Sequence, residues 1–238
     1  MKLLLFDLDG TILHARHTAG RVPFDLAMRD VFGVDVSIGA MRPDGKTDPA
    51  IVAELLAMAG ASPEVDAAAL AAVERALSAR FAETLAAGAT TVEPVAGVRA
   101  LLEAVAADPR FASAVLTGNL AGAAALKLRA AGLADFFAVG AFGSDHALRA
   151  ALPDVARERF RHHSGRAVRR EDCVILGDTP LDHAAAAANG MPAVLIATGR
   201  IPLAELAALR PAAAFADWSD GAAIHAALAA LAERRDTA

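Results

Sequence analysis

Short apolar runs of strand length recur along this chain, and longer stretches with helical periodicity separate them. Most runs are continuously apolar, which is typical of strands buried on both faces of a parallel sheet. Alternating strands and helices predict an α/β fold with a doubly wound parallel sheet, whose strands all end at one edge, where ligands bind. The expected strands are Lys2–Phe6, Ser113–Leu116, Phe137–Val139, Cys173–Leu176, Ala193–Ile196 and Ala213–Phe215, and the expected helices are Gly97–Ala107, Ala121–Ala131, Ala150–His163, Pro180–Asn189, Pro202–Leu209 and Gly221–Arg235.

A segment from about residue 21 to residue 87 breaks this alternation, because it shows helical periodicity and no convincing strand. Pro23 is expected to open a helix that ends near Gly33, since proline fits the first helical turn. Asp48, which precedes a proline, is expected to cap a second helix. Ser62-Pro63-Glu64 marks the start of a third helix. The segment is therefore predicted to be a helical insert.

Two turns, Ala15–Gly20 and Gly88–Glu93, are expected to join this insert to the sheet. The chain then divides into a core of residues 1–16 and 92–238 and a helical cap of residues 17–91. Its length fits one core with a small insert, because a domain commonly contains about 100–200 residues.

Composition argues against several classes of protein. The chain is 55% hydrophobic, but much of this is alanine, and no run of about 18 strongly apolar residues could span a membrane. The apolar stretch that ends at Asp7 is shorter than a secretory signal requires. The single cysteine, Cys173, cannot form an internal disulfide, and the net charge of -5 disfavours general nucleic-acid binding. We therefore expect a cytoplasmic monomer or homodimer that binds neither nucleic acid nor membranes.

The strongest chemical signal is Asp7-Leu8-Asp9-Gly10-Thr11, directly after the first expected strand. Two carboxylates so close together repel and raise one another's pKa, so such a pair usually holds a cation or a proton. Gly10 allows the backbone to turn sharply. An ordinary turn rich in aspartate is the alternative interpretation.

Two further polar turns follow expected strands. Thr117-Gly118-Asn119 stands at a helix start, where a hydroxyl and free N–H groups suit a phosphate oxyanion, although the same residues also make ordinary turns. Asp178 could be a metal ligand, whereas Asp182 could orient its neighbours or cap a helix. Because parallel strands end at one edge, Asp7, Asp9 and Asp178 are predicted to form one oxygen-rich site, which favours Mg²⁺.

Taken in order, the Asp-x-Asp-Gly-Thr, Thr-Gly-Asn and Gly-Asp-Thr-Pro-x-Asp motifs resemble the haloacid dehalogenase superfamily over nearly the whole chain. More narrowly, they are similar to its phosphoglycolate phosphatase and β-phosphoglucomutase-like branch. The resemblance implies a Rossmann-like core with a helical cap after the first strand. It also implies a Mg²⁺-dependent phosphatase that acts on a small phosphorylated metabolite.

Residue roles follow from the same resemblance. Asp7 is implied to be the nucleophile that forms an aspartyl-phosphate, and Asp9 the general acid and base. Asp178 is implied to bind Mg²⁺ with Asp7 and the backbone carbonyl of Asp9, and Asp182 to support them. The expected phosphate-binding residues are Gly10, Thr11, Thr117, Gly118 and Asn119.

The family also requires a cation beside the nucleophile, and two residues are candidates. Arg149 lies 32 residues after Thr117, close to the usual spacing, whereas Lys127 lies on the helix that directly follows Thr117. Either could instead be a solvated helix charge. In the insert, Arg42 and Lys46 are candidates for reading a carboxylate or second phosphate of the substrate, and a mobile basic loop is the alternative.

Two other functions stay open at the level of sequence. A phosphosugar mutase could use the same scaffold, and a phosphate-binding regulatory module could have lost turnover. Halide release is disfavoured, because dehalogenating members of the superfamily lack an acid at the position of Asp9.

Overall fold

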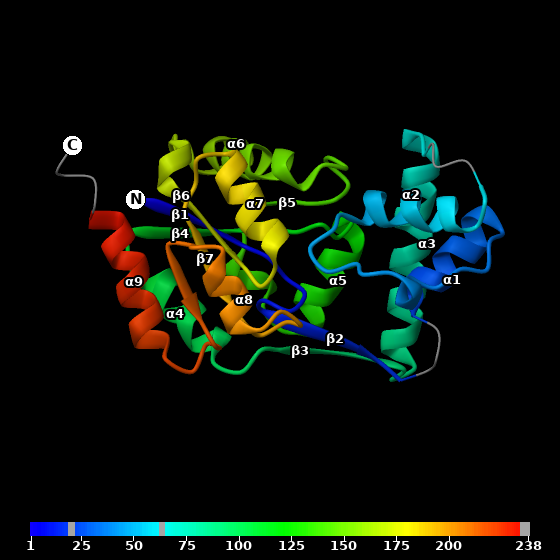
Figure 1. The fold of residues 1–238 in the computed structure, drawn as a ribbon, viewed down its shortest axis with the longest axis horizontal. Coiled ribbons are helices and arrows are strands. Elements are labelled where there is room, and N and C mark those ends of the chain that lie inside the picture. Colours follow the sequence, from blue (N-terminus) through cyan, green and yellow to red (C-terminus); the bar gives the residue numbers. More distant parts are fainter. Residues whose placement is uncertain (19–21, 62–64, 234–238) are drawn as a thin grey trace.

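The computed structural model describes residues 1–18, 22–61 and 65–233. Its centre is a six-stranded parallel sheet in the order β5-β4-β1-β6-β7-β8 (Figure 1). From β1 the chain steps outward to β4 and β5, and it then returns to the other side of β1 for β6, β7 and β8. This reversal confirms the predicted doubly wound α/β fold. The strands are β1 Lys2–Phe6, β4 Phe111–Leu116, β5 Gly140–Ala141, β6 Cys173–Gly177, β7 Ala193–Ile196 and β8 Ala213–Phe215.

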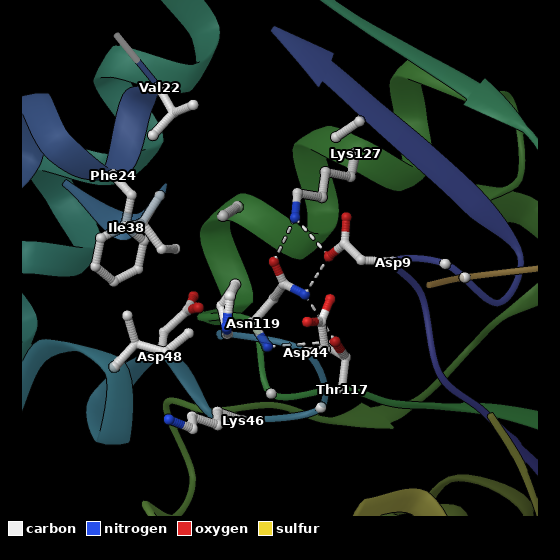
Figure 2. A pocket seen from close by; sticks show the side chains of 18 of the residues that line it. Asp9, Val22, Phe24, Ile38, Asp44, Lys46, Asp48, Thr117, Asn119 and Lys127 are labelled. Atoms are coloured by element: carbon white, nitrogen blue, oxygen red, sulfur yellow. Dashed lines mark hydrogen bonds and ion pairs between the residues drawn. The ribbon is translucent and has the colours of Figure 1, made fainter. Parts of the chain in front are cut away.

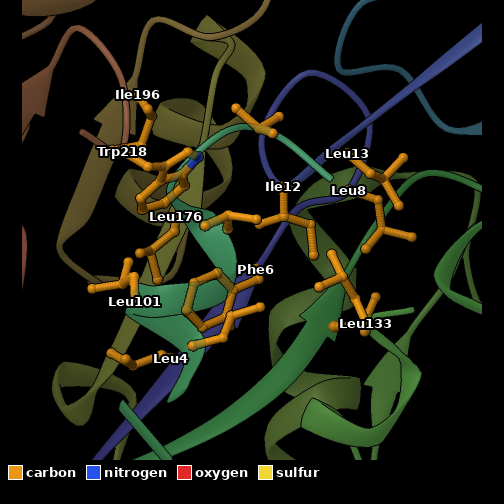
Figure 3. Close-up of a cluster of buried hydrophobic side chains, with 14 of the residues drawn as sticks. Leu4, Phe6, Leu8, Ile12, Leu13, Leu101, Leu133, Leu176, Ile196 and Trp218 are labelled. Atoms are coloured by element: carbon orange, nitrogen blue, oxygen red, sulfur yellow. The ribbon is translucent and has the colours of Figure 1, made fainter. Parts of the chain in front are cut away.

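Helices cover both faces of the sheet because β1 is apolar on both sides. Leu4 and Phe6 belong to a core with helices α4 (Val98–Ala107), α5 (Ala121–Ala130) and α9 (Gly221–Glu233) (Figure 3). The opposite side chains, Leu3 and Leu5, pack in a second core with α6 Leu152–Ser164, α7 Pro180–Ala188 and α8 Leu203–Ala208. None of the described helices is long and apolar enough to cross a membrane.

One expected strand is wrong. The Phe137–Val139 segment forms no strand, and β5 instead consists of Gly140 and Ala141 after a short 3-10 helix, Ala134–Phe136. Phe137 packs edge-on against Phe6, with ring centroids 5.7 Å apart, so its hydrophobicity serves core packing. A Cβ on Gly140 would lie 2.7 Å from Cβ of Val115, so glycine lets this short strand approach β4 closely.

The insert contains helices α1 (Pro23–Phe32), α2 (Asp48–Met58) and α3 (Ala67–Ala86), at one end of the molecule in Figure 1. As predicted, Pro23 opens α1 and Gly33 ends it in a left-handed conformation with φ 66°. The N-cap of α2 is Thr47 and not Asp48, whose carboxylate is used elsewhere.

The third predicted helix start and the two predicted turns have different outcomes. Ser62-Pro63-Glu64 lies outside the described residues, and α3 begins at Ala67 with Asp66 as its N-cap. The expected turns are wrong in part: residues 15–17 and 90–93 belong to β2 (Leu13–His17) and β3 (Thr90–Pro94), which pair antiparallel, whereas Gly88 does lie in a turn. Gly20, at the end of the first turn, is not described. This ribbon joins the insert to the core.

Candidate active site

Four strands of the sheet end in polar turns that face one cavity. Asp7 follows β1, Thr117 follows β4, Asp178 follows β6 and Thr198 follows β7, and all four line a cavity of about 740 Å³ between the sheet edge and the helical insert. The convergence follows from parallel topology, because every strand ends on the same side. Residues 7, 117 and 178 were predicted to meet here, whereas Thr198 was missed.

Three carboxylates meet at and beneath the floor of this cavity, which Asp7 and Asp178 line. One oxygen each of Asp7, Asp178 and Asp182 lies within 4.8 Å of the others, and all three side chains are buried. Nη2 of Arg149 lies 2.9 Å from Oδ1 of Asp7 and also pairs with Asp182. Arg149 begins the 3-10 helix Arg149–Ala151, which leads into α6. Arg149, which directly precedes α6 in the chain, therefore holds two carboxylates of the cluster together.

The electrostatics of the cluster show that one arginine does not balance it. Burial raises the pKa of Asp7 to about 6, although the Arg149 charge opposes this. Burial, together with the charges of Asp7 and Asp182, raises the pKa of Asp178 to about 8. The raised pKa values mean that these carboxyl groups ionise less readily than usual. A divalent cation would favour their ionised form, and carboxylate oxygens are hard ligands that suit such a cation.

The three acids are not equivalent as possible ligands. Asp182 is committed to a capping box, accepting hydrogen bonds from the backbone N–H and the hydroxyl of Thr179, and it also pairs with Arg149. Asp178 accepts one hydrogen bond from the Thr11 hydroxyl at 2.8 Å. Asp7 and Asp178 are therefore better placed than Asp182 to hold a metal ion, and the residues present fit a site of this kind.

Two glycines make room for the Asp178 carboxylate. A Cβ on Gly10, where φ is 84°, would lie 2.4 Å from Asp178 Oδ2, and a Cβ on Gly199 would lie 1.7 Å from the same atom. Gly199 was not predicted. The available signal was Thr198-Gly199 directly after the apolar run of β7, which repeats the Thr117-Gly118 pattern after β4.

Asp9 lies apart from the acidic cluster. Its side chain is 39% exposed, and its Oδ2 lies 2.6 Å from Lys127 Nζ and 2.7 Å from Asn119 Nδ2 (Figure 2). Lys127 also donates to Asn119 Oδ1 at 2.6 Å. The structure therefore brings both candidate cations into the site, with Arg149 against Asp7 and Lys127 against Asp9. The third carboxylate in the described cluster is Asp182 and not Asp9.

Thr117 and Asn119 form a small hydrogen-bonded turn after β4. The buried Thr117 hydroxyl accepts hydrogen bonds from the backbone N–H of Asn119 at 3.2 Å and from its side-chain amide at 2.9 Å. The adjacent Gly118 touches the insert, because a Cβ there would lie 2.2 Å from the carbonyl oxygen of Lys46. This turn is therefore covered by the loop before α2.

The two predicted basic residues of that loop differ in position. Lys46 lines the cavity, but its Nζ lies 2.5 Å from Oε2 of Glu54 on α2. Arg42 is exposed and is not among the described residues that line the cavity. The structure therefore does not bring the two together as a pair facing the cavity.

Carboxylates from the insert dock onto the first turn of α5, a feature that the sequence reasoning missed. Oδ2 of the buried Asp48 accepts the backbone N–H of Leu120 at 2.8 Å. Glu74 accepts the N–H of Gly122 at 3.0 Å and the Ser144 hydroxyl at 3.0 Å. A helix N-terminus has unpaired N–H groups and a positive dipole end, so these acids hold the insert against the core.

Comparison with known proteins identifies the family. A family model described as haloacid dehalogenase-like hydrolase matches residues 1–190, whereas no curated protein is significantly similar in sequence. A predicted phosphoglycolate phosphatase from Haemophilus somnus 129pt shares 20% identity and a TM-score of 0.65, covering 94% of this chain and 98% of that chain.

Two further solved structures are similar. A protein provisionally described as a β-phosphoglucomutase from Thermotoga maritima shares 19% identity with a TM-score of 0.57, covering 95% of this chain and 99% of that chain. CbbY from Rhodobacter sphaeroides, solved in complex with phosphate, shares 21% identity with a TM-score of 0.61. The match covers 92% of this chain and 96% of that chain. These identities indicate a shared fold, while the family match spans all three motifs. The chain belongs to the haloacid dehalogenase-like hydrolases, and its structural neighbours include phosphoglycolate phosphatase-like and β-phosphoglucomutase-like members.

Proposed function

We propose that this hydrolase is a Mg²⁺-dependent phosphatase that cleaves small phosphate monoesters through a phosphorylated Asp7. The observation that carries the proposal is the position of the Asp7 carboxylate, which lies at the floor of a cavity beside Asp178 and Arg149. Phosphoryl transfer needs a nucleophile, positive charge around the phosphoryl oxygens and a proton donor, and residues of each kind converge here.

The phosphate is proposed to sit between the ends of β1 and β4. Arg149 supports this seat, since its Nε is buried and has no hydrogen-bond partner among the described residues. An orphaned buried donor is costly, so a phosphoryl oxygen is a favourable partner for it. Thr117 is proposed to hold another oxygen, with the N–H groups of Gly118 and Asn119. We assign the cation beside the nucleophile to Arg149, because it contacts Asp7 directly.

The reaction is proposed to proceed in two in-line steps. An oxygen of Asp7 forms a bond to phosphorus while the bond from phosphorus to the ester oxygen breaks, and Asp9 donates its proton to the leaving alcohol. Asp9 then removes a proton from water, which attacks phosphorus and releases phosphate together with the free Asp7 carboxylate. Asp7 and Asp178 would hold Mg²⁺, which would supply positive charge to neutralise the phosphoryl group. General acid catalysis of this kind is commonly worth about 10²- to 10⁴-fold in rate.

Lys127 and Asn119 are proposed to position Asp9. Their contacts of 2.6 and 2.7 Å hold its Oδ2, and Asp9 lines the cavity without belonging to the carboxylate cluster around Asp7. The two carboxylates, which only Leu8 separates in the sequence, thereby have different partners and are proposed to have different roles.

The experiment that tests this proposal is a phosphate-release screen over small phosphate esters with and without Mg²⁺. The proposal predicts Mg²⁺-dependent release by the wild-type protein and none above background by Asp7→Asn. Free phosphate in every turnover distinguishes a phosphatase from a phosphosugar mutase, which returns the phosphoryl group to a sugar. Binding of phosphate without turnover of any ester would instead indicate a regulatory module.

A further inference from the structure

The cavity has two walls of different chemistry. Its floor carries the charged residues of the core, whereas its far wall, contributed by the insert, is mainly apolar. Figure 2 shows Val22, Phe24 and Ile38 across the cavity from Asp9 and Lys127. The large apolar residues of this wall are Val22, Phe24, Ile38, Met41, Ile51, Leu77 and Phe81.

The acidic groups on the insert side are committed to the fold. Asp25 Oδ1 accepts the backbone N–H of Ile38 at 2.8 Å, and Asp48 accepts the N–H of Leu120. Both carboxylates line the cavity and add negative charge to its far side. A second anionic group on a substrate would therefore meet negative charge there.

The basic groups near this wall are also engaged. Lys46 pairs with Glu54, and Arg200, a residue of the core that is 74% exposed, lies 3.7 Å from Asp44. Burial, reinforced by the Lys127 charge, lowers the pKa of His17, so its imidazole is neutral at neutral pH. Among the described residues that line the far wall, none is a cation without an acidic partner. An anion-binding pair made from Arg42 and Lys46 finds no support in this geometry.

From these contacts we infer that the leaving alcohol of the substrate is an uncharged, predominantly apolar group, and that the substrate carries no second anion. The inference rests on the proposed function, because it places the phosphoryl group at Asp7 and the alcohol against the far wall. A cavity of about 740 Å³ accommodates a small metabolite. Burying apolar surface there is favourable, whereas burying an unpaired carboxylate is costly.

The kinetic test compares matched esters in the presence of Mg²⁺. Hexyl phosphate and benzyl phosphate represent the inferred class, and phosphoglycolate and glycerol 3-phosphate represent anionic and polar alcohols. In the alkyl series, each added methylene is expected to raise kcat/KM by about fourfold until the wall is filled. A kcat/KM for phosphoglycolate that exceeds the value for benzyl phosphate would overturn the inference and leave the proposed function intact.

A pair of methionine substitutions tests the wall itself. Met41→Lys places a cation on the apolar wall, and it is expected to shift the ratio of kcat/KM values toward phosphoglycolate by about tenfold or more. Met58→Lys is the matched control, because Met58 lies on α2, is 53% exposed and does not line the cavity. If the ratio of kcat/KM values is the same in Met41→Lys and Met58→Lys, the wall that contains Met41 does not contact the leaving alcohol.

A binding measurement separates failure of the inference from failure of the proposed function. Calorimetry would compare 2-phenylethylphosphonate with 3-phosphonopropionate, which mimic benzyl phosphate and phosphoglycolate and cannot be hydrolysed. We expect the phenyl compound to bind at least about tenfold more tightly to the wild-type protein with Mg²⁺. If no ester is turned over but this order holds, the proposed function fails and the inferred ligand class stands. The reverse order overturns the inference whether or not turnover occurs.

Discussion

Asp7 and Asp9 are separated by a single residue, yet their carboxylates lie in different environments. The side chain of Asp7 is 7% exposed and contacts Arg149, whereas that of Asp9 is 39% exposed and contacts Lys127. Residues i and i+2 of an extended segment point to the same face, so the turn at Gly10 is what directs the two side chains to different surroundings. The two cations are consequently expected to differ in what they contribute to stability.

Arg149→Met is predicted to lower the free energy of unfolding by about 3 kcal/mol, because it leaves buried carboxylates without their cation. Lys127→Met is the matched comparison, and because its partner Asp9 is 39% exposed its cost is predicted to be about 1 kcal/mol or less. Urea unfolding of both variants at neutral pH measures the two values. A smaller loss for Arg149→Met than for Lys127→Met would contradict the view that Arg149 anchors the acidic cluster.

A second prediction concerns the buried Asp48. Burial raises its pKa to about 6, partly opposed by the Lys127 charge and the hydrogen bond from Leu120. Because an unfolded aspartate has a pKa of about 3.9, the folded state favours the protonated form. The contribution of Asp48 is most favourable below about pH 4 and is lost as the pH rises through about 6.

Asp48→Asn should therefore gain stability relative to the wild type as the pH rises from 5 to 7.5, by about 1–1.5 kcal/mol. Asparagine keeps an acceptor for the Leu120 N–H, and it removes the buried charge. Asp48→Ala should be less stable than Asp48→Asn at every pH, because that N–H loses its partner. Urea unfolding measures the free energies of unfolding of the wild type and Asp48→Asn. If their difference does not change with pH, the raised pKa of Asp48 does not contribute to stability.

At the scale of elements, α5 is the contact point between the core and the insert. Its first turn receives Asp48 from the start of α2 and Glu74 from α3. Leu120 and Ala123, at this end of α5, pack in the same apolar cluster as the insert helices. The docking therefore combines apolar burial with acids placed at a helix N-terminus.

Glu74→Ala is predicted to loosen this docking. Amide exchange in a peptide covering residues 119–126 should accelerate by about tenfold, because the Gly122 N–H and the Ser144 hydroxyl lose their acceptors. Glu83→Ala on the same helix is the control, since Glu83 is exposed and pairs with Arg80. Identical exchange in the two variants would show that Glu74 does not hold the insert.

The elements that the sequence predicted well are those whose signals are local. Pro23 and Gly33 bracket α1 by backbone conformation, and the continuous apolar runs mark β1, β6 and β7. The β2–β3 ribbon was missed because its alternation is short and weak, although Thr90 and Val92 are both buried on one face. Phe137 misled the prediction because an aromatic residue near a strand can pack on the core from a loop.

At the scale of the whole molecule, the winding of the sheet explains why motifs distant in sequence meet. The order β5-β4-β1-β6-β7-β8 places the ends of β1, β4 and β6 side by side, so the meeting of Asp7, Thr117 and Asp178 could be predicted from topology. The docking of the insert could not, because it depends on pairs such as Asp48 and Leu120 that no local pattern connects.

The choice between the two cations illustrates the same limit. Sequence spacing left Arg149 and Lys127 equivalent, since both lie downstream of Thr117 at plausible distances. Their partners are decided by which helix each belongs to: Lys127 on α5 reaches Asp9, and Arg149 before α6 reaches Asp7. Only the three-dimensional arrangement of the helices around the sheet edge separates them.

Asp7 is the group proposed to receive the phosphoryl moiety, and acid-quenched mass spectrometry during turnover tests this directly. With Mg²⁺ and a rapidly cleaved ester, the peptide containing Asp7 is predicted to carry the mass of one phosphoryl group. The adduct should be absent without Mg²⁺ and in Asp7→Asn. Phosphate release at the wild-type rate by Asp7→Asn, or an adduct on another residue, would show that Asp7 is not the nucleophile.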